Sequence, residues 1–426
     1  MKSRDDTIPR DNGTIIVDSW TFFGSFSKDM RILEVNKFFH ERRGAERHFL
    51  DVIEALSAEG HEVAVFSMDH PKNLPSRYPT YLVSRAGFAE GDAGNSWHVL
   101  KGIGRLFWSF ETRRLMRKAL DEFRPDIVHV HNAYHQLSPS FLPIIRKRGI
   151  PVILTVHDYH IVSPDKDSYH ESVGSSYWKF LFVRKYPFAK RVLLVLRAYW
   201  DRIAGFYSKN VDRYIAPSVF VKETLKCAGV PEEKIQIIPH FIADESASEK
   251  AISVDDAGKE PYALYVGSVS GEKGIADLVT LFDSIGYPLV LAGRKTMDIP
   301  KSVSARYVGE RTKEEISGLY AGASFVVSAS RLPETFGLVA LEANTAGKPF
   351  FGYATGALSE IVEQGKTGWL AEDENDLAAF LRRYIADHGT IDDAETIRCK
   401  TLERFGREKY LEALVGLAEN LQKGKR

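Results

Sequence analysis

Short apolar segments alternate with helix-like segments along most of the chain, and this alternation most constrains its fold. An apolar run at 32–35 is followed by residues 48–67, where apolar side chains at helical spacing lead past Gly60 into a second apolar run. Strands that alternate with helices favour a parallel sheet covered by helices on both faces. Further apolar runs of the same kind lie at 127–131, 151–158 and 212–218.

The alternation begins again after a polar segment at 243–261, with apolar runs at 262–268, 288–293, 305–309, 323–330 and 348–353. A chain of 426 residues is too long for one ordinary core. We therefore expect two doubly wound α/β domains, Rossmann-like in character, that face each other across a cleft at the carboxyl ends of their strands. The expected parts are an extension at 1–29, an N-terminal domain at 30–240, a second domain at 241–405 and a final helix at 406–426.

The composition excludes several classes of protein. The 44% hydrophobic content is typical of a globular chain, and the net charge of zero predicts no nucleic-acid partner. Two cysteines, Cys227 and Cys399, cannot form a disulfide framework or a cysteine-based metal site, and they indicate a reducing compartment. No run of eighteen apolar residues predicts a transmembrane helix, and residues 1–29 lack the apolar centre of a signal peptide.

The zero net charge hides an asymmetry between the two parts of the chain. Residues 1–216 hold 32 lysines and arginines against 25 acids, a net charge of +7, which leaves −7 for the remainder. A basic first half favours an anionic partner, such as a phosphorylated substrate or a lipid surface. A chance difference between solvated helix faces is the alternative.

The stretch SRLPETFGLVALEANTAGKP, residues 330–349, places two glutamates around a helix start. Glu334 precedes the start, Gly337 opens the helix, and Glu342 lies about 7–8 Å further along its axis at 1.5 Å per residue. Amides at a helix N-terminus bind anions, and carboxylates bind vicinal hydroxyls. This layout suits a nucleoside diphosphate sugar, with its phosphate on the amides of Gly337, Leu338 and Val339. Two ordinary surface carboxylates are the alternative.

The longer string PETFGLVALEANTAGKPFFGYATGALSEIVEQGKTGWL resembles the signature of glycosyltransferase family 4, the retaining enzymes of GT-B fold. The resemblance covers about 40 consecutive residues. It implies a GT-B fold with a C-terminal helix that returns to the N-terminal domain, and a donor site that includes Phe336. It also implies that Glu334 holds the transferred sugar and that Glu342 holds the ribose hydroxyls.

The segment LYVGSVSGEKGIADLV, residues 264–279, resembles the family's strand and loop that carry a basic pair for the donor diphosphate. The resemblance assigns Lys273 to the phosphate. The family often has arginine where this chain has Ser268, so one positive charge is either absent or supplied by Arg294 or Arg331. A solvent-facing loop lysine is the alternative for Lys273.

Two N-terminal segments also resemble the family. In ERRGAERH, Gly44 matches a glycine that lets the backbone approach the donor phosphate, although Arg43 stands where a second glycine is frequent. In LTVHDYH, His157 matches a histidine near the transferred sugar; a structural core histidine is the alternative. After the neighbouring strand, the acceptor-side candidates are His131, Asn132 and Tyr134, or these residues merely pack the strand end.

Two patterns could suggest a metal, and we expect neither to bind one. Asp165 and Asp167 form an Asp-x-Asp pair, but they lie in a polar loop rather than at the strand end that a metal role requires. His129, His131 and His135 offer imidazoles with no cysteine or acidic residue nearby in the sequence. We therefore predict no metal and no bound cofactor besides the nucleotide-sugar donor as co-substrate.

Residues 178–202 are basic and rich in aromatic side chains, with seven lysines and arginines against one aspartate. An amphipathic segment of this kind can lie in a lipid headgroup layer, as in family members that extend lipid-linked sugars. A solvated helix on the N-terminal domain is the alternative. Together with the reducing compartment that the two cysteines indicate, this segment predicts a cytoplasmic location at the inner face of a membrane.

Together these residues predict a metal-independent, retaining hexosyltransferase that moves a sugar from a UDP- or GDP-sugar to a hydroxyl of a glycan or lipid-linked acceptor. The pathway expected by resemblance is polysaccharide or cell-surface glycan synthesis. His157, Glu334 and Lys273 are the expected catalytic residues. The alternatives are a sugar-nucleotide epimerase of the same fold and, because of Ser268, a non-catalytic sugar-nucleotide binder.

Overall fold

The computed structural model describes residues 29–42, 44–85, 96–134, 136–165, 176–183, 186–242, 260–387 and 390–425. Most of the expected extension at 1–29 and most of the polar segment at 243–261 lie outside the described residues, as do Arg43, His135 and Asp167. Among the described residues, no helix is both long enough and apolar enough to cross a bilayer.

The N-terminal part forms a parallel sheet of seven strands in the order β3-β2-β1-β4-β5-β6-β7. Its central strands are short apolar runs, as buried strands of a parallel sheet require. The strands are β1 (Arg31–Val35), β2 (Glu62–Met68), β3 (Thr80–Val83), β4 (Ile127–Val130), β5 (Val152–Thr155), β6 (Arg213–Ala216) and β7 (Ile235–Ile237).

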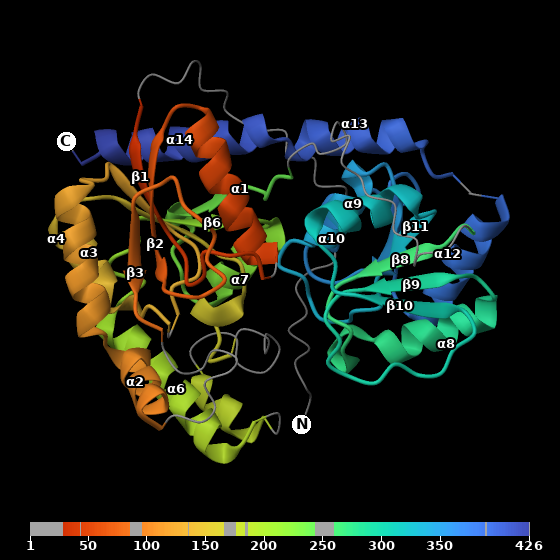
Figure 1. The fold of residues 1–426 in the computed structure, drawn as a ribbon, viewed down its shortest axis with the longest axis horizontal. Coiled ribbons are helices and arrows are strands. Elements are labelled where there is room, and N and C mark those ends of the chain that lie inside the picture. The colour runs from red at the N-terminus through yellow and green to blue at the C-terminus, as the bar shows by residue number, and fades with distance from the viewer. Residues whose placement is uncertain are drawn as a thin grey trace, which may run out of the picture.

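Helices cover both faces of this sheet (Figure 1). One core layer packs Leu33 and Val35 of β1 against helices that include α3 and α7, and the opposite layer packs Ile32 against α1. Alternate side chains of β1 therefore enter opposite cores, as the two-residue period of a strand dictates. The helices are α1 (Gly44–Ala58), α2 (Ser96–Phe107), α3 (Phe110–Glu122), α4 (Leu142–Lys147), α6 (Phe188–Ala204) and α7 (Val219–Cys227).

The C-terminal part forms a second parallel sheet, of six strands in the order β10-β9-β8-β11-β12-β13. Helices again lie on both of its faces, with α8 and α12 on one side and α9 to α11 on the other. The strands are β8 (Ala263–Val266), β9 (Leu289–Ala292), β10 (Ala305–Gly309), β11 (Phe325–Val327), β12 (Phe350–Tyr353) and β13 (Gly368–Ala371). The helices are α8 (Ile275–Ile285), α9 (Lys313–Gly322), α10 (Leu338–Thr345), α11 (Leu358–Ile361) and α12 (Glu374–Asp387).

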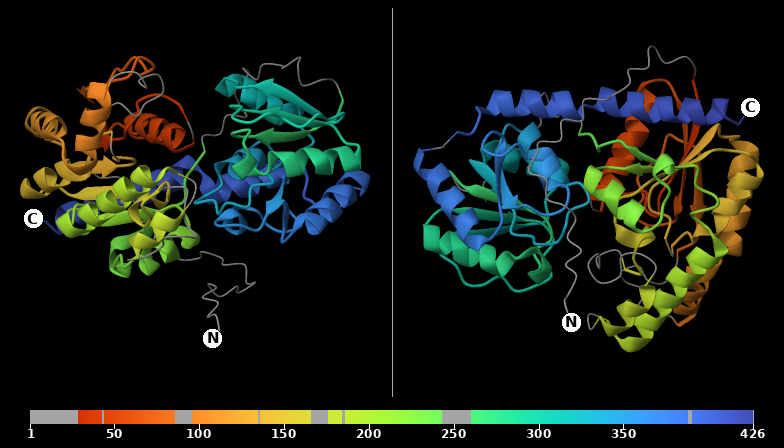
Figure 2. Two further views of the ribbon diagram at one scale, coloured as in Figure 1. Left: turned by 90° about the horizontal axis from the view of Figure 1, so that it is seen from below. Right: turned by 180° about the vertical axis from the view of Figure 1, so that it is seen from behind.

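The two last helices connect the domains along one side of the molecule (Figures 1 and 2). Helix α13 (Ala394–Phe405) packs on α10 of the C-terminal domain, and α14 (Arg407–Lys423) packs on the N-terminal sheet. Tyr410, Leu414 and Val415 of α14 enter the same core layer as α1. The expected GT-B architecture, including the returning helix, is confirmed.

Burial of α14 against the N-terminal sheet predicts that this helix stabilises that domain. Leu414→Ala should lower the free energy of unfolding by about 2–5 kcal/mol, because Leu414 is almost fully buried. Asn420→Ala on the exposed face of the same helix should change it by less than about 0.5 kcal/mol. Urea unfolding followed by circular dichroism measures both. Equal effects of the two variants would contradict this packing.

Candidate active site

The candidate site lies where loops at the carboxyl ends of the two sheets touch each other. Tyr159, after β5, donates its hydroxyl hydrogen to the Pro333 carbonyl at 3.0 Å. The Thr335 hydroxyl donates to the His157 carbonyl at 2.9 Å. The loop that carries Glu334 is therefore bonded directly to the loop that carries His157.

Helix α10 begins at the end of this loop, as the sequence predicts. Gly337 caps it in the left-handed region at φ +95°, and Gly347 follows its end at φ +70° in the expected C′ position. The amides of Ala340 and Leu341 make the first bonds to the Gly337 carbonyl. The amides of Gly337, Leu338 and Val339 stand before this ladder, where helix N-termini attract anions.

Glu334 and Lys273 meet beside this helix start. Lys273 lies in a single 3₁₀ turn, Gly271–Lys273, directly before α8, and its Nζ is 2.6 Å from a Glu334 carboxylate oxygen. Both side chains are about one-third exposed. A cation and a carboxylate thus stand together at the N-terminus of α10.

A glycine fixes the backbone of Glu334 from behind. Gly356 has φ +59°, and a Cβ placed on it would lie 2.3 Å from the Glu334 carbonyl oxygen. The Ala357 amide donates to that same carbonyl at 2.9 Å. Only glycine permits this close approach, so the chain after β12 determines where the Glu334 side chain starts.

Glu342 bridges the two domains. One carboxylate oxygen accepts from Arg47 of α1 at 3.0 Å, and the other accepts from the Tyr320 hydroxyl of α9 at 2.7 Å. Burial, and then the charge of Glu342, raises the pKa of Tyr320 well above its ordinary value, so this phenol is a hydrogen donor. Glu342, which the sequence assigns to ribose hydroxyls, is thus already a hydrogen-bond acceptor here.

The other predicted donor-side residues lie after the ends of β8, β9 and β11 or just before α10. Phe336 is buried under the start of α10. The Ser268 carbonyl accepts from the Tyr265 hydroxyl at 2.9 Å. Arg294 is exposed after β9, and Arg331 is exposed over the ring of Tyr353.

His157 lies among other histidines. Its Nε2 is 2.8 Å from Nδ1 of His131, and the rings of His48 and His240 pack close to it. Burial, and then the neighbouring imidazoles, lowers the pKa of His157 well below its ordinary value. Burial does the same to His48, His131 and His240. These imidazoles are therefore neutral at physiological pH.

The predicted acceptor-side residues are buried behind His157. His131 has both ring nitrogens engaged, and the Tyr134 hydroxyl lies between Asn132 and Asp158. Gly44 begins α1, and a Cβ placed on it would lie 2.6 Å from Cδ1 of Leu338. The N-terminal domain therefore contacts the start of α10 at the glycine that the sequence singled out.

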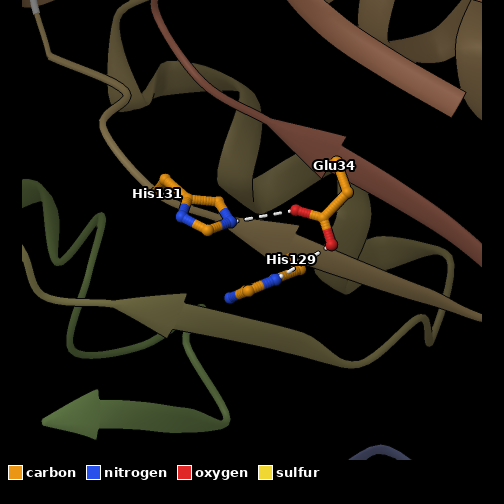
Figure 3. Close-up of side chains that lie close together, drawn as sticks. All are labelled: Glu34, His129 and His131. Atoms are coloured by element: carbon orange, nitrogen blue, oxygen red, sulfur yellow. Dashed lines mark hydrogen bonds and ion pairs between the residues drawn. The ribbon is translucent and has the colours of Figure 1, made fainter. Parts of the chain in front are cut away.

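Glu34 was missed by the sequence analysis. Its carboxylate joins His129 and His131, with 3.0 Å from each oxygen to one imidazole nitrogen (Figure 3). A glutamate inside the apolar run at 32–35 was the signal that could have revealed it. Arg47 and Tyr320 gave no comparable signal, because their pairing with Glu342 depends on how the two domains meet.

The structure bears differently on the two sequence patterns that could suggest a metal site, the Asp-x-Asp pair and the histidine set. Asp165 accepts from the Tyr186 hydroxyl at 3.1 Å, and its partner in the Asp-x-Asp pair lies outside the described residues. Glu34, His129 and His131 bring their ligand atoms within 4.8 Å of one another. Each of these atoms nonetheless already has a partner at hydrogen-bond distance.

Two family models together match most of the chain. Residues 42–246 match the model described as Glycosyltransferase Family 4, and residues 248–408 match Glycosyl transferases group 1. The chain is a family 4 glycosyltransferase. It is therefore an enzyme that transfers a sugar from a nucleotide sugar, in a family of retaining transferases.

Relatives of this glycosyltransferase are named for different products. It is 24% identical to the glycogen synthase of Mycobacterium tuberculosis, over 81% of this chain and 83% of that protein. It is 26% identical to the alpha-monoglucosyldiacylglycerol synthase of Streptococcus pneumoniae, over 92% of this chain and 88% of that one. The chain is thus similar both to an enzyme named for a polysaccharide and to one named for a glycolipid.

Solved structures share the fold of this glycosyltransferase. Anabaena Alr3699/HepE, solved in complex with UDP and glucose, aligns with a TM-score of 0.63 at 16% identity, over 92% of this chain and 100% of that one. Sucrose-phosphate synthase from Thermosynechococcus elongatus aligns with a TM-score of 0.61 at 21% identity, over 93% and 98% of the two chains. Both alignments extend across the two domains.

The buried histidines predict that the N-terminal domain of this glycosyltransferase loses stability in acid. The ordinary pKa of 6.5 applies to the unfolded chain, and the folded pKa values are lower. Below about pH 6.5 the unfolded chain therefore binds protons that the folded chain does not, and folding weakens as the pH falls. Each such histidine contributes up to about 1.4 kcal/mol per pH unit.

Urea unfolding of the N-terminal domain between about pH 7 and about pH 5.5 measures this slope. His240→Phe replaces one buried imidazole by an apolar ring. The free energy of unfolding should then depend less steeply on pH, by up to about 1.4 kcal/mol per pH unit, because one proton fewer is bound on unfolding. An unchanged slope in this variant, or stability that does not depend on pH, would show that these imidazoles are not neutral in the folded protein.

Proposed function

We propose that this enzyme is a retaining, metal-independent hexosyltransferase that moves a sugar from a nucleoside diphosphate sugar to a hydroxyl of a membrane-associated acceptor. The observation that carries the proposal is the pairing of Lys273 with Glu334 beside the first amides of α10. Cation, amides and carboxylate stand together where a diphosphate and its attached sugar would meet.

The donor would lie along the start of α10. Lys273 and the amides of Gly337 to Val339 would stabilise the charge that develops on the leaving diphosphate, which is electrostatic stabilisation of the transition state. Glu334 would bind the transferred sugar, and Glu342 would accept hydrogen bonds from the ribose. UDP-sugars are the first donors to test, because Alr3699/HepE was solved with UDP and with UDP-glucose.

The leaving phosphate would itself receive the acceptor proton, on the same face of the sugar. No carboxylate stands out in the sequence as a nucleophile for a double displacement. The positive charge at the site comes from Lys273 and helix amides, so we expect turnover without a divalent cation. Release of nucleoside diphosphate only when an acceptor is present would distinguish transfer from epimerisation.

A lipid-linked or lipid acceptor is supported by the surface around α6. Large apolar side chains project from α6 and from the preceding 3₁₀ helix Tyr177–Phe182, with basic residues between them. Figure 1 shows α6 at the outer edge of the N-terminal domain. The pneumococcal relative is named for a glucosylated diacylglycerol, a lipid, which points the same way. The exposed side chains are Trp178, Phe182, Phe188, Leu196, Trp200 and Ile203.

This surface would place the enzyme at the cytoplasmic face of a membrane, in the synthesis of a cell-surface glycan. Aromatic side chains in the headgroup layer, with lysines and arginines beside them, bind anionic bilayers. The net positive charge of the first half of the chain adds to this attraction.

Donor binding tests the assignment of Glu342. Glu342→Ala should weaken binding of the UDP-sugar about tenfold or more, because it removes charge-assisted hydrogen bonds to the ribose. Arg47→Ala breaks the same interdomain ion pair but keeps the carboxylate, so it should leave binding unchanged or tighter. Titration calorimetry without metal measures both.

The matched control for Glu342→Ala is Glu374→Ala, which removes an exposed carboxylate at the start of α12. Its donor affinity should equal that of the wild type. If Arg47→Ala weakens binding as much as Glu342→Ala does, the ion pair and not the ribose explains Glu342, and the donor assignment is wrong.

Liposome flotation tests the membrane surface. Replacing both Phe182 and Phe188 by serine should reduce binding to anionic vesicles about tenfold or more, because each exposed aromatic ring that enters the bilayer contributes about 1.5–3 kcal/mol. Val303→Ser removes an even more exposed apolar side chain from the C-terminal domain and should have no effect. Loss of binding in both variants, or in neither, would contradict docking through α6.

A further inference from the structure

A chain of hydrogen bonds begins at a buried carboxylate and ends at His157. Glu34 lies in β1 with no exposed surface, and its two oxygens are each 3.0 Å from one imidazole nitrogen, Nδ1 of His129 and Nε2 of His131. The far nitrogen of His129 is 2.7 Å from the Thr155 hydroxyl. The far nitrogen of His131, Nδ1, is 2.8 Å from Nε2 of His157.

These hydrogen bonds permit only one arrangement of protons on the two histidines when Glu34 is ionised. A carboxylate only accepts, so His131 must donate from Nε2. A neutral His131 then has a bare Nδ1, which can only accept. His157 must therefore carry its proton on Nε2, and its own Nδ1 is left as an acceptor. His131 and His157 are both neutral because burial lowers their pKa values.

We propose that His131 and Glu34 are positioning residues for His157: Glu34 fixes the tautomer of His131, and His131 fixes the tautomer and orientation of His157. His157 then presents Nδ1 as a hydrogen-bond acceptor, suited to a hydroxyl of a bound sugar and unsuited to a group that can only accept. The inference rests on the proposed function, in which His157 contacts the transferred sugar.

The packing around His157 supports a fixed ring. His48 of α1 and His240 lie at centroid distances of 5.7 and 4.9 Å from it. The ring of His131 lies at a centroid distance of 5.1 Å, with an angle of 18° between the two ring planes. The His157 carbonyl accepts from Thr335 of the opposite domain. Backbone and ring are therefore both located by contacts, while the hydrogen bond to His131 selects the proton position.

A purely structural role explains the buried Glu34 and its hydrogen bonds to histidine less well. A buried carboxylate is costly to desolvate even when it is paired, and apolar side chains of similar volume often stabilise a core equally or better. Glu34 occupies an interior strand position whose neighbours in sequence, Leu33 and Val35, are fully buried apolar residues. The charged position is the one that connects through His131 to the domain contact.

Two-bond hydrogen–nitrogen NMR spectra of protein labelled at histidine report which ring nitrogen carries the proton, without donor or acceptor. Near neutral pH, His131 and His157 should each show a single tautomer with the proton on Nε2. A proton on Nδ1 of His157 would overturn the proposal. So would a His131 ring without its Nε2 proton, as coordination of a metal ion would produce.

Three variants separate positioning from structure. His131→Gln keeps an amide that can donate to Glu34 but has no acceptor where Nδ1 stood. His131→Asn keeps an oxygen near the former Nδ1 but loses the link to Glu34. Glu34→Met is apolar and similar in volume. His131→Gln and Glu34→Met should lose the single His157 tautomer and lower kcat about tenfold or more, whereas His131→Asn should keep most of the wild-type kcat.

A structural role predicts the opposite order for the two His131 variants, because His131→Gln preserves the partner of the buried carboxylate and should have the higher melting temperature. Activity that follows melting temperature would therefore overturn the proposal. His61→Gln is the control: it leaves no acceptor where the buried Nδ1 accepts from the Met30 amide before β1, and it should lower stability without changing kcat.

Failure of this inference is distinguishable from failure of the proposed function. The tautomer is measured without substrate. A wild-type protein with no transferase activity would therefore contradict the proposed function, whereas the NMR spectra would still decide whether Glu34 and His131 fix the tautomer of His157. Expected spectra together with an unchanged kcat in His131→Gln would show that His131 does not position His157 for the reaction.

Discussion

The contact between the loops and helices at the carboxyl ends of the two sheets is the constraint on which the rest of the structure depends. Arg47 and Glu342 form an ion pair across it at 3.0 Å. Glu360 of α11 accepts from the first amides of α7 at 2.7 and 2.9 Å, so the C-terminal domain caps a helix of the N-terminal domain. Burial raises the pKa of Glu360, as expected for a carboxyl removed from water between domains. Helices α13 and α14 connect the domains a second time, along one side of the molecule.

The ion pair and the helix cap of this contact are polar, unlike the apolar cores on either side. An interdomain surface of charged pairs and helix caps can separate without exposing a core. Glu342 illustrates the consequence. Its partners Arg47 and Tyr320 stabilise the carboxylate in the position from which it would bind a ribose, and one of them belongs to the opposite domain. If Glu342 binds the donor as proposed, donor binding and the approach of the two domains are coupled through this one side chain.

Much of the fold could be predicted from sequence because buried parallel strands are apolar runs. The strands that were missed, β3, β7 and β13, are all at sheet edges, where a strand pairs on one side only and its composition is mixed. In the candidate site, Lys273, Glu334 and Glu342 could be named from local patterns and resemblance. Their partners could not, since Arg47 meets Glu342 across 295 positions of sequence.

The histidines also show that a residue can be identified from the sequence while its partner cannot. His131 and His157 were selected as residues at strand ends, and the structure bonds them to each other. Glu34 connects them to His129, which it precedes by 95 positions in the sequence. Only the pairing of strands β1 and β4 brings Glu34 and His129 together. A polar residue within an apolar run is visible in a sequence. Its partner is determined by the order of strands in the sheet.

A crystal structure with a bound UDP-sugar tests the central claim most directly. The account predicts the diphosphate on the amides of Gly337 to Val339 with Lys273 beside it, and the Glu342 carboxylate on the ribose hydroxyls instead of on Arg47. A nucleotide bound elsewhere, or a Glu342 that still pairs with Arg47 while the site is occupied, would contradict it.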